Sequence, residues 1–353
     1  MASPTTIDHL GMDLLHNILA RLSSIDFASA DCVSRSWNHV CGRILCRPKL
    51  SSACSFNQSL QVAVEEVVNK VLSERIRPHF AIASVGTRFH IKFNIEEAHK
   101  LITAKLGSKV PLITNCSPGI IGRDVNSGEF KEASRAYGDT SITDEFDRSL
   151  VQERAKGGIM LTVGFLPGLK VKLIKLAKED LTSQDARAYS KKFINDIREF
   201  SASISGCQSP AAIMMFSEPL QGVIDVMEKV DHAMSPETVI VGDYGYRFHS
   251  DTESLNNITA TKERVSAVVA LVFVMDRTKP LDPATALSSI ANVSNHLRSF
   301  KQERTAAGDK REVFGGFIFT SYDRSDFRKP NVNSSPFLDN FPSATLGGIL
   351  GGP

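Results

Sequence analysis

The stretch GGIMLTVGFLPGLKVKLIKL, residues 157–176, lies near the middle of the chain and combines two kinds of strand pattern. Its first half is a largely apolar run, which is typical of a strand buried on both faces. Its second half alternates lysine with Val171 and Leu173, which is typical of a strand with one exposed face. A Leu-Pro-Gly turn signal separates the halves, so the sequence predicts two strands joined by a turn.

The segments around this stretch repeat one plan: an apolar run, a short amphipathic helix, and a second apolar run that ends near glycine. The three copies span residues 80–122, 211–248 and 314–353. A continuous apolar strand on either side of a helix is typical of a βαβ unit in a sheet that is covered by helices. Further helices are predicted over residues 59–76 and 183–204, and a buried strand over 265–276. The sequence therefore predicts an α/β mixed sheet.

The first 50 residues follow a different pattern, that of short amphipathic helices. Four apolar residues recur at helical spacing and share one helix face: Leu15, Ile18, Leu19 and Leu22. A second helix is predicted to begin near Asp26, and Val33 and Trp37 continue the spacing. Two interpretations stay open on this pattern: the helices dock on the rest of the chain, or they present a surface to another protein.

The order and spacing of certain residues in this stretch match a known motif. They are Leu10 to Leu15, Ile18, Leu19, Leu22, Asp26, Phe27, and Val33 to Trp37. This spacing resembles the F-box motif, although Gly11 and Ser23 stand where that motif usually has proline. The resemblance implies a three-helix domain over residues 1–50. It also implies binding to a Skp-family adaptor and, through the adaptor, to the cullin and RING subunits of a ubiquitin ligase.

The resemblance implies that the apolar residues of the motif bind the adaptor. They are Leu10, Met12, Leu14, Leu15, Ile18, Leu19, Leu22, Phe27, Val33 and Trp37. This interpretation requires an exposed apolar surface that includes Leu15, Ile18, Leu22 and Trp37. The chain would then be a non-catalytic receptor subunit in ubiquitination, which selects a protein substrate for proteasomal degradation.

The larger part of the chain carries a second series of motifs in a fixed order, which includes FAIASVG (80–86), PLITNCSPGIIG (111–122), VGFLPGLKVKLIKL (163–176) and GGFIFTSYDRSDF (315–327). In this order they resemble the FIST domain, which also follows an F-box in eukaryotic proteins that include plant relatives. The resemblance implies an N-terminal half over residues 51–250. Within it, the dispersed Gly, Ser, Asp and Glu of residues 123–156 predict a polar mobile insertion. It implies an incomplete, truncated C-terminal half over residues 251–353. The expected fold class is thus α+β in two parts: a small all-α F-box, then an α/β mixed-sheet FIST domain built from repeated βαβ-like units.

Composition and charge argue against several classes of function. The formal net charge is only +2 and no long basic run occurs, so nucleic acid and membranes are not expected as partners. We expect no signal peptide and no membrane span, and therefore a cytoplasmic or nuclear protein, or both. The six cysteines are scattered singly without a Cys-x-x-Cys pair, which predicts reduced thiols, no metal site and no cofactor.

Polar residues at the ends of predicted strands are candidates for a ligand or substrate site, because ligands approach α/β sheets there. They are Ser84, Cys116, Ser117, Gly119, Ser217, Asp243, Tyr244 and Arg324. The FIST resemblance implies sensing of a small, amino-acid-like molecule, which is the alternative function. A simpler interpretation is that the glycines serve tight turns and that Cys116 is an inert core thiol. A hydrolase using Cys116 would need a base, and no histidine lies in a recognised catalytic motif.

Overall fold

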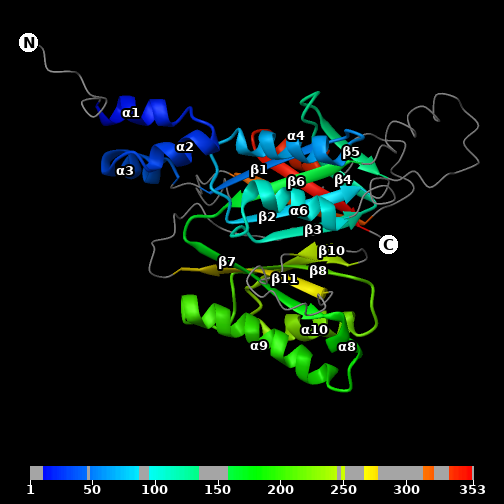
Figure 1. Ribbon diagram of the computed structural model, residues 1–353. Helices are drawn as coiled ribbons and strands as arrows, with labels where there is room; N and C mark the ends of the chain where they lie inside the picture. The colour runs from blue at the N-terminus through cyan, green and yellow to red at the C-terminus, as the bar shows by residue number, and fades with distance from the viewer. Residues whose placement is uncertain are drawn as a thin grey trace, which may run out of the picture.

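The computed structural model describes residues 11–45, 48–86, 95–134, 158–244, 248–250, 266–276, 313–321 and 334–351. The predicted site residues Leu10 and Arg324 lie outside these ranges. A small group of helices at the N-terminal end lies beside a larger part made of sheets covered by helices (Figure 1). This arrangement confirms the coarse prediction of a helical unit followed by mixed α/β sheets.

The N-terminal helical unit, residues 11–45, contains three short helices: α1 (Met12–Leu19), α2 (Ser24–Asp31) and α3 (Arg35–Ile44). Serine side chains cap two of them, since Ser23 Oγ accepts from the Asp26 amide and Ser34 Oγ accepts from the Trp37 amide. Ser23 is therefore the N-cap of α2, which begins at Ser24, two residues before the predicted start near Asp26. An apolar core of its own holds the unit together: Leu15, Leu19, Phe27, Ala30, Val40 and Cys41.

Three sheets make up the described part of the larger domain. The first sheet has the order β1 (Lys49–Ser55), β6 (Ile159–Phe165), β2 (Phe80–Gly86), β3 (Leu112–Ser117), β10 (Phe248–Ser250). The second has the order β7 (Leu169–Ala177), β11 (Ser266–Met275), β8 (Ala212–Ser217), β9 (Val239–Tyr244). The third has the order β12 (Gly315–Ser321), β13 (Thr345–Gly351), β4 (Gly119–Arg123), β5 (Phe130–Ser134).

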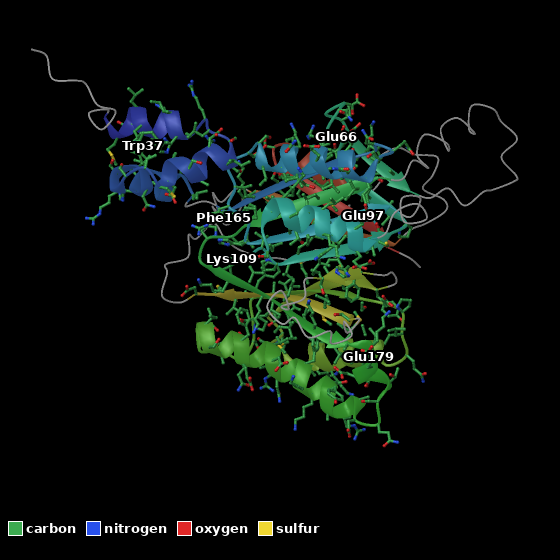
Figure 2. All side chains as sticks on the ribbon, in the orientation of Figure 1. Trp37, Glu66, Glu97, Lys109, Phe165 and Glu179 are labelled. Atoms are coloured by element: carbon green, nitrogen blue, oxygen red, sulfur yellow. The ribbon has the colours of Figure 1, made fainter. Side chains whose placement is uncertain are left out.

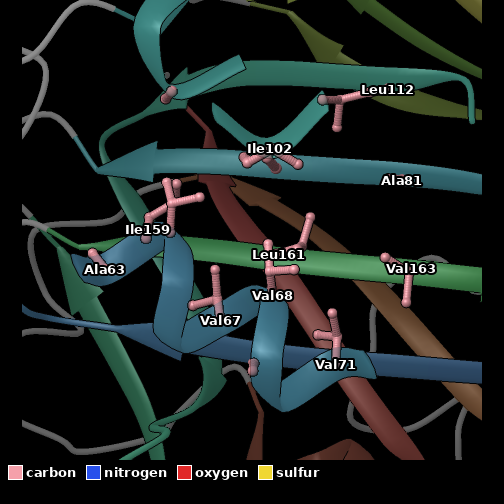
Figure 3. Close-up of a cluster of buried hydrophobic side chains, with 14 of the residues drawn as sticks. Ala63, Val67, Val68, Val71, Ala81, Ile102, Leu112, Ile159, Leu161 and Val163 are labelled. Atoms are coloured by element: carbon pink, nitrogen blue, oxygen red, sulfur yellow. The ribbon is translucent and has the colours of Figure 1, made fainter. Parts of the chain in front are cut away.

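Helices cover the outer face of each sheet. The first sheet carries α4 (Leu60–Leu72) and α6 (Ile95–Leu106); the second carries α8 (Lys178–Thr182), α9 (Ala186–Ser205) and α10 (Val223–Ala233); the third carries α12 (Ser335–Asn340). Figure 3 shows the layer between α4 and the first sheet, where Val67, Val68 and Val71 lie over Leu161 and Val163 of β6. None of the helices in the described ranges is long and apolar enough to cross a membrane.

The three predicted βαβ units are confirmed. In each one the two strands pair in parallel and a helix connects them: β2, α6 and β3; β8, α10 and β9; β12, α12 and β13. The sequence predicted these units because their strands are largely apolar on both faces. One face packs against the helix and the other against the interior.

The two strands predicted in residues 157–176 are confirmed as β6 and β7, but they do not pair with each other. The turn forms, with Gly168 at φ 80° and the Leu169 amide donating to the Leu166 carbonyl oxygen at 3.1 Å. The two strands nevertheless separate, since β6 lies between β1 and β2 in the first sheet, whereas β7 pairs with β11 in the second. Pairing with a distant apolar strand replaces the local pairing, so this stretch joins two sheets.

The predicted division at residue 250 does not separate two folding units. Strand β11, from the C-terminal side, lies between β7 and β8 of the N-terminal side. Strand β13, also from the C-terminal side, pairs with β4. The predicted insertion at 123–156 also begins in ordered structure, because β4 and β5 form an antiparallel pair up to Ser134. Residues 135–156 of that segment lie outside the described residues.

The inner faces of the three sheets meet in one apolar interior. The ring of Phe80 on the first sheet lies 5.2 Å from that of Phe273 on the second, and Phe216 on the second lies 5.9 Å from Phe319 on the third. The third sheet also crosses the first at close range. A Cβ added at Gly347 of β13 would lie 2.4 Å from Thr162 Oγ1 and 2.7 Å from Ser52 Oγ, so only glycine fits there.

We predict that Gly347→Ala lowers the free energy of unfolding by roughly 1–3 kcal/mol, because the new methyl group forces the two sheets apart. Gly42→Ala is the control: its Cβ meets nothing within 4 Å. On helix α3 that control should gain about 0.5–1 kcal/mol from helix propensity. Urea unfolding of both variants measures the difference, and a Gly347→Ala protein as stable as the unsubstituted one contradicts the close crossing.

Candidate functional site

The N-terminal helical unit exposes a group of large apolar side chains. They are Met12, Leu14 and Ile18 on α1, Ile25 on α2, and Val33 after α2. The exposed fraction reaches 51% for Leu14 and 60% for Val33. Because a small soluble unit rarely leaves so many large apolar groups in water, we take this group as the candidate interaction surface. Below, the apolar face means the four exposed side chains that are also predicted adaptor contacts, Met12, Leu14, Ile18 and Val33; of these, Leu14 and Ile18 share one side of α1.

Three of the predicted contacts do not belong to an exposed surface. Leu15, Leu19 and Phe27 are at most 4% exposed and form the core of the helical unit. The expectation that Leu15 lies on an exposed apolar surface is therefore wrong. An i, i+4 repeat places residues on one helix face but does not say whether that face meets its own neighbours or a partner.

Leu22 and Trp37 are partly buried and pack against the same core. Figure 2 places Trp37 inside the helical unit, away from the sheets. Its indole Nε1 is buried and has no hydrogen-bond partner among the described residues. Trp37 thus packs as a large side chain against the core of this small unit.

The helical unit touches the sheets through a narrow contact. The Ser24 hydroxyl donates to the carbonyl oxygen of Glu74 and accepts from the Ile76 amide at 3.1 Å. Leu45 packs against both the helical core and the core beneath α4. The two interpretations of the sequence are therefore compatible: the helices attach to this chain on one side and expose the apolar face elsewhere.

The strand-end residues divide according to the face on which they lie. Ser84 of β2 and Asp243 of β9 lie on inner faces, and a residue the sequence analysis missed, Asn115 of β3, joins them. Ser84 Oγ donates to Asn115 Oδ1 at 2.6 Å, and the side chain of Asn115 approaches the Asp243 carboxyl. The structure thus brings residues of two sheets together in a small polar cluster within the interior.

The remaining strand-end residues do not join this cluster. Cys116 lies on the helix-covered face of β3, while Ser217 donates to the sulfur of Met227 on α10. Ser117 Oγ donates to the Gly119 carbonyl oxygen within the turn from β3 to β4. Tyr244 is exposed on the helix side of β9. Residues near the end of a strand can point to either face of the sheet. Their position in the sequence therefore did not show which of them lie together.

Asn115 is the most informative member of the cluster. It is 2% exposed, and its Nδ2 completes no hydrogen bond among the described residues. Because Ser84 holds the amide oxygen, the NH₂ end is the part of Asn115 that can face the Asp243 carboxyl. The signal in the sequence was Asn115 itself, because an amide in a strand that is buried throughout needs partners for both its oxygen and its NH₂ group.

Burial raises the pKa of the Asp243 carboxyl to about 6, against smaller opposing effects of the Asn115 side chain and the Tyr244 amide. The carboxyl therefore changes charge close to neutral pH. The buried thiols behave differently: burial raises the pKa of Cys41 to about 11 and raises that of Cys54 as well. These two thiols stay protonated at neutral pH, as expected for core cysteines.

Residues 7–47 match the F-box domain family. Below, this matching stretch is called the F-box domain. It includes the helical unit with its apolar face, and F-box domains generally bind Skp-family adaptors. Within the described residues, no group of three or more His, Cys, Asp or Glu side chains could hold a metal ion.

The resemblance to a known protein extends beyond the F-box domain. An F-box/LRR-repeat protein from Arabidopsis thaliana is 37% identical over 312 residues, which covers 87% of this chain. The match covers 55% of that protein, so this chain spans about half the length of the curated relative. The sheets following the F-box domain are therefore also similar to part of a plant F-box protein.

We predict a specific pH dependence from Asp243. Its folded pKa of about 6 lies above the ordinary value of 3.8, so the folded protein holds this proton more tightly than the unfolded chain does. The stabilising contribution is complete below the ordinary pKa and is lost as the pH rises through the folded pKa. In Asp243→Asn, which cannot ionise, this loss should disappear.

Urea unfolding of both proteins from about pH 4 to about pH 7 measures the effect. The free energy of unfolding of the variant, minus that of the unsubstituted protein, should rise over this interval. Parallel curves would mean that Asp243 ionises normally in the folded state.

Proposed function

We propose that this protein is the substrate-recognition subunit of a Skp, cullin and F-box ubiquitin ligase. Its F-box domain binds a Skp-family adaptor and, through it, the cullin and RING subunits. The sheet domain selects the protein that is ubiquitinated and then degraded by the proteasome. The observation that carries the proposal is the apolar face, which is exposed on a unit that matches the F-box family.

The packing of the F-box domain supports a separate binding role for the apolar face. Leu15 and Leu19 of α1 belong to the core that α1 shares with α2 and α3. Ile18, on the same helix, is 39% exposed and contributes nothing comparable to that core. A partner that covers such side chains gains the hydrophobic contribution of their burial, about 25 cal/mol per Å².

The proposed receptor does no chemistry of its own. It accelerates ubiquitin transfer by holding a substrate near the charged conjugating enzyme, which raises the effective concentration of the reacting groups. Such a subunit needs no metal and no cofactor. We propose that it acts in the cytoplasm, the nucleus or both, where these ligases meet their substrates.

The sheet domain, by its order of strand motifs, is proposed to be a FIST domain. In the receptor role its surface selects the substrate protein. The Ser84, Asn115 and Asp243 cluster favours a second candidate function, a sensor for a small amino-acid-like molecule. Such a molecule carries an ammonium group that pairs with a carboxylate and oxygens that accept from an amide, which are the groups this cluster offers.

We predict that Ile18→Asp weakens the binding of a purified Skp-family adaptor at least 100-fold, because a charge then has to be buried at the interface. Isothermal titration calorimetry on the full chain measures the affinity. The matched control is Val62→Asp: Val62 is 41% exposed on α4, away from the F-box domain, and should leave the affinity unchanged.

A core variant separates contact from folding. Leu19→Ala should lower the free energy of unfolding of the F-box domain by about 2–5 kcal/mol through the cavity it leaves. Ile18→Asp should keep the circular dichroism spectrum of the unsubstituted protein. Equal adaptor affinity for Ile18→Asp and the unsubstituted protein, or no binding by either when both are folded, contradicts the receptor proposal.

The sensor candidate has its own test. Thermal unfolding is followed with each of the common amino acids at millimolar concentration. A ligand that binds the folded protein raises the midpoint, and Asp243→Asn should abolish that rise. If no amino acid raises the midpoint of the unsubstituted protein, the sensor candidate is wrong for this class of ligand.

A further inference from the structure

We infer that Ser24 is a positioning residue: its hydroxyl fixes the orientation of the F-box domain relative to the sheet domain. The contact itself is a property of this chain alone. Its consequence for ubiquitin transfer rests on the proposed function, because only a receptor subunit has to hold a substrate at a set position relative to an adaptor.

The hydroxyl makes two hydrogen bonds to one short loop. It donates to the carbonyl oxygen of Glu74 and accepts from the Ile76 amide at 3.1 Å. Both partners are main-chain groups of residues 73–79, which connect α4 to β2. A hydroxyl is the smallest side-chain group that can donate and accept at once, so alanine at this position leaves both main-chain groups without this partner.

Each end of the contact is anchored in a core. Ile76 is 4% exposed and belongs to the apolar cluster beneath α4. Ser24 is the first residue of α2, and Phe27, one turn later, belongs to the core of the F-box domain. A displacement of the F-box domain at this point therefore has to break the hydrogen bonds or disturb a packed core.

A second contact restricts rotation about the first. Leu45, which follows α3, packs against both the F-box core and the cluster beneath α4. Lys49 at the start of β1 pairs with Glu74 at 2.7 Å, which keeps the loop beside the chain that leaves the F-box domain. This ion pair is partly exposed and adds little by itself. Ser24 and Leu45 together define the orientation at two separate points.

The attachment leaves the apolar face available. The contacts to the sheet domain use Ser24 and Leu45, whereas Met12, Leu14, Ile18 and Val33 remain exposed. An adaptor bound at the apolar face would thus inherit the orientation that Ser24 imposes. Loss of the Ser24 contact should change the geometry between the two parts without changing adaptor affinity.

Two native cysteines make the orientation measurable. Cys32 in the F-box domain and Cys207 after α9 are exposed, while Cys41, Cys54 and Cys116 are buried. Spin labels on Cys32 and Cys207 report the distance between the two parts by pulsed electron paramagnetic resonance. Cys46, which lies outside the described residues, is replaced by serine in every sample.

We expect a single narrow distance distribution in the protein with Ser24 unsubstituted and at least a doubling of its width in Ser24→Ala. Ser24→Thr keeps a hydroxyl and should restore the narrow distribution. Ser23→Ala is the matched control, because it removes the cap of α2, worth about 1 kcal/mol, but leaves the Ser24 contact in place. It should keep the narrow distribution.

Adaptor affinity is measured on the same samples. A distribution for Ser24→Ala as narrow as that of the unsubstituted protein overturns the inference, as does a broad distribution in both. If the distributions behave as expected but no sample binds the adaptor, the positioning role of Ser24 stands and the proposed function fails. If all samples bind the adaptor equally and only Ser24→Ala broadens, both are supported.

Discussion

The close crossing of the first and third sheets is the constraint on which the rest of the structure depends. Strand β13 passes over the Ser52 and Thr162 side chains at Gly347, and these two hydroxyls lie 2.8 Å apart. That crossing brings the inner faces of all three sheets into one interior. Each sheet can then be covered by helices only on its outer face, which is why each of the three βαβ units has its helix on that side.

A shared interior also explains how the chain moves between sheets. Strands adjacent in sequence, such as β6 and β7, pair in different sheets, and β10 returns from the second sheet to the edge of the first. Ser84, Asn115 and Asp243 form a polar cluster in this largely apolar interior. Burial of the Asp243 carboxyl there is the physical cause of its raised pKa, and the Asn115 side chain beside it opposes that rise.

The stability of the F-box domain is limited by its small size. About 35 residues cannot bury enough apolar surface to be stable with a wide margin, and this unit also leaves its apolar face in water. Its core is closed by Trp37 and Leu22, and its attachment through Ser24 and Leu45 connects it to a larger core. The contacts with the sheet domain thus add to the stability of this unit, while the residues of the apolar face stay exposed.

The sequence by itself determined the local structure. The capped helices, the three βαβ units and the F-box spacing follow from periodicity and turn chemistry, which act over a few residues. Only the tertiary structure decided which strands pair across the chain, why residues 157–176 are not a hairpin, and which members of the F-box motif are buried. It also brought Asn115 to Asp243. Strands that are apolar on both faces accept many partners equally well, so the choice among them depends on the packing of the whole interior rather than on any local pattern.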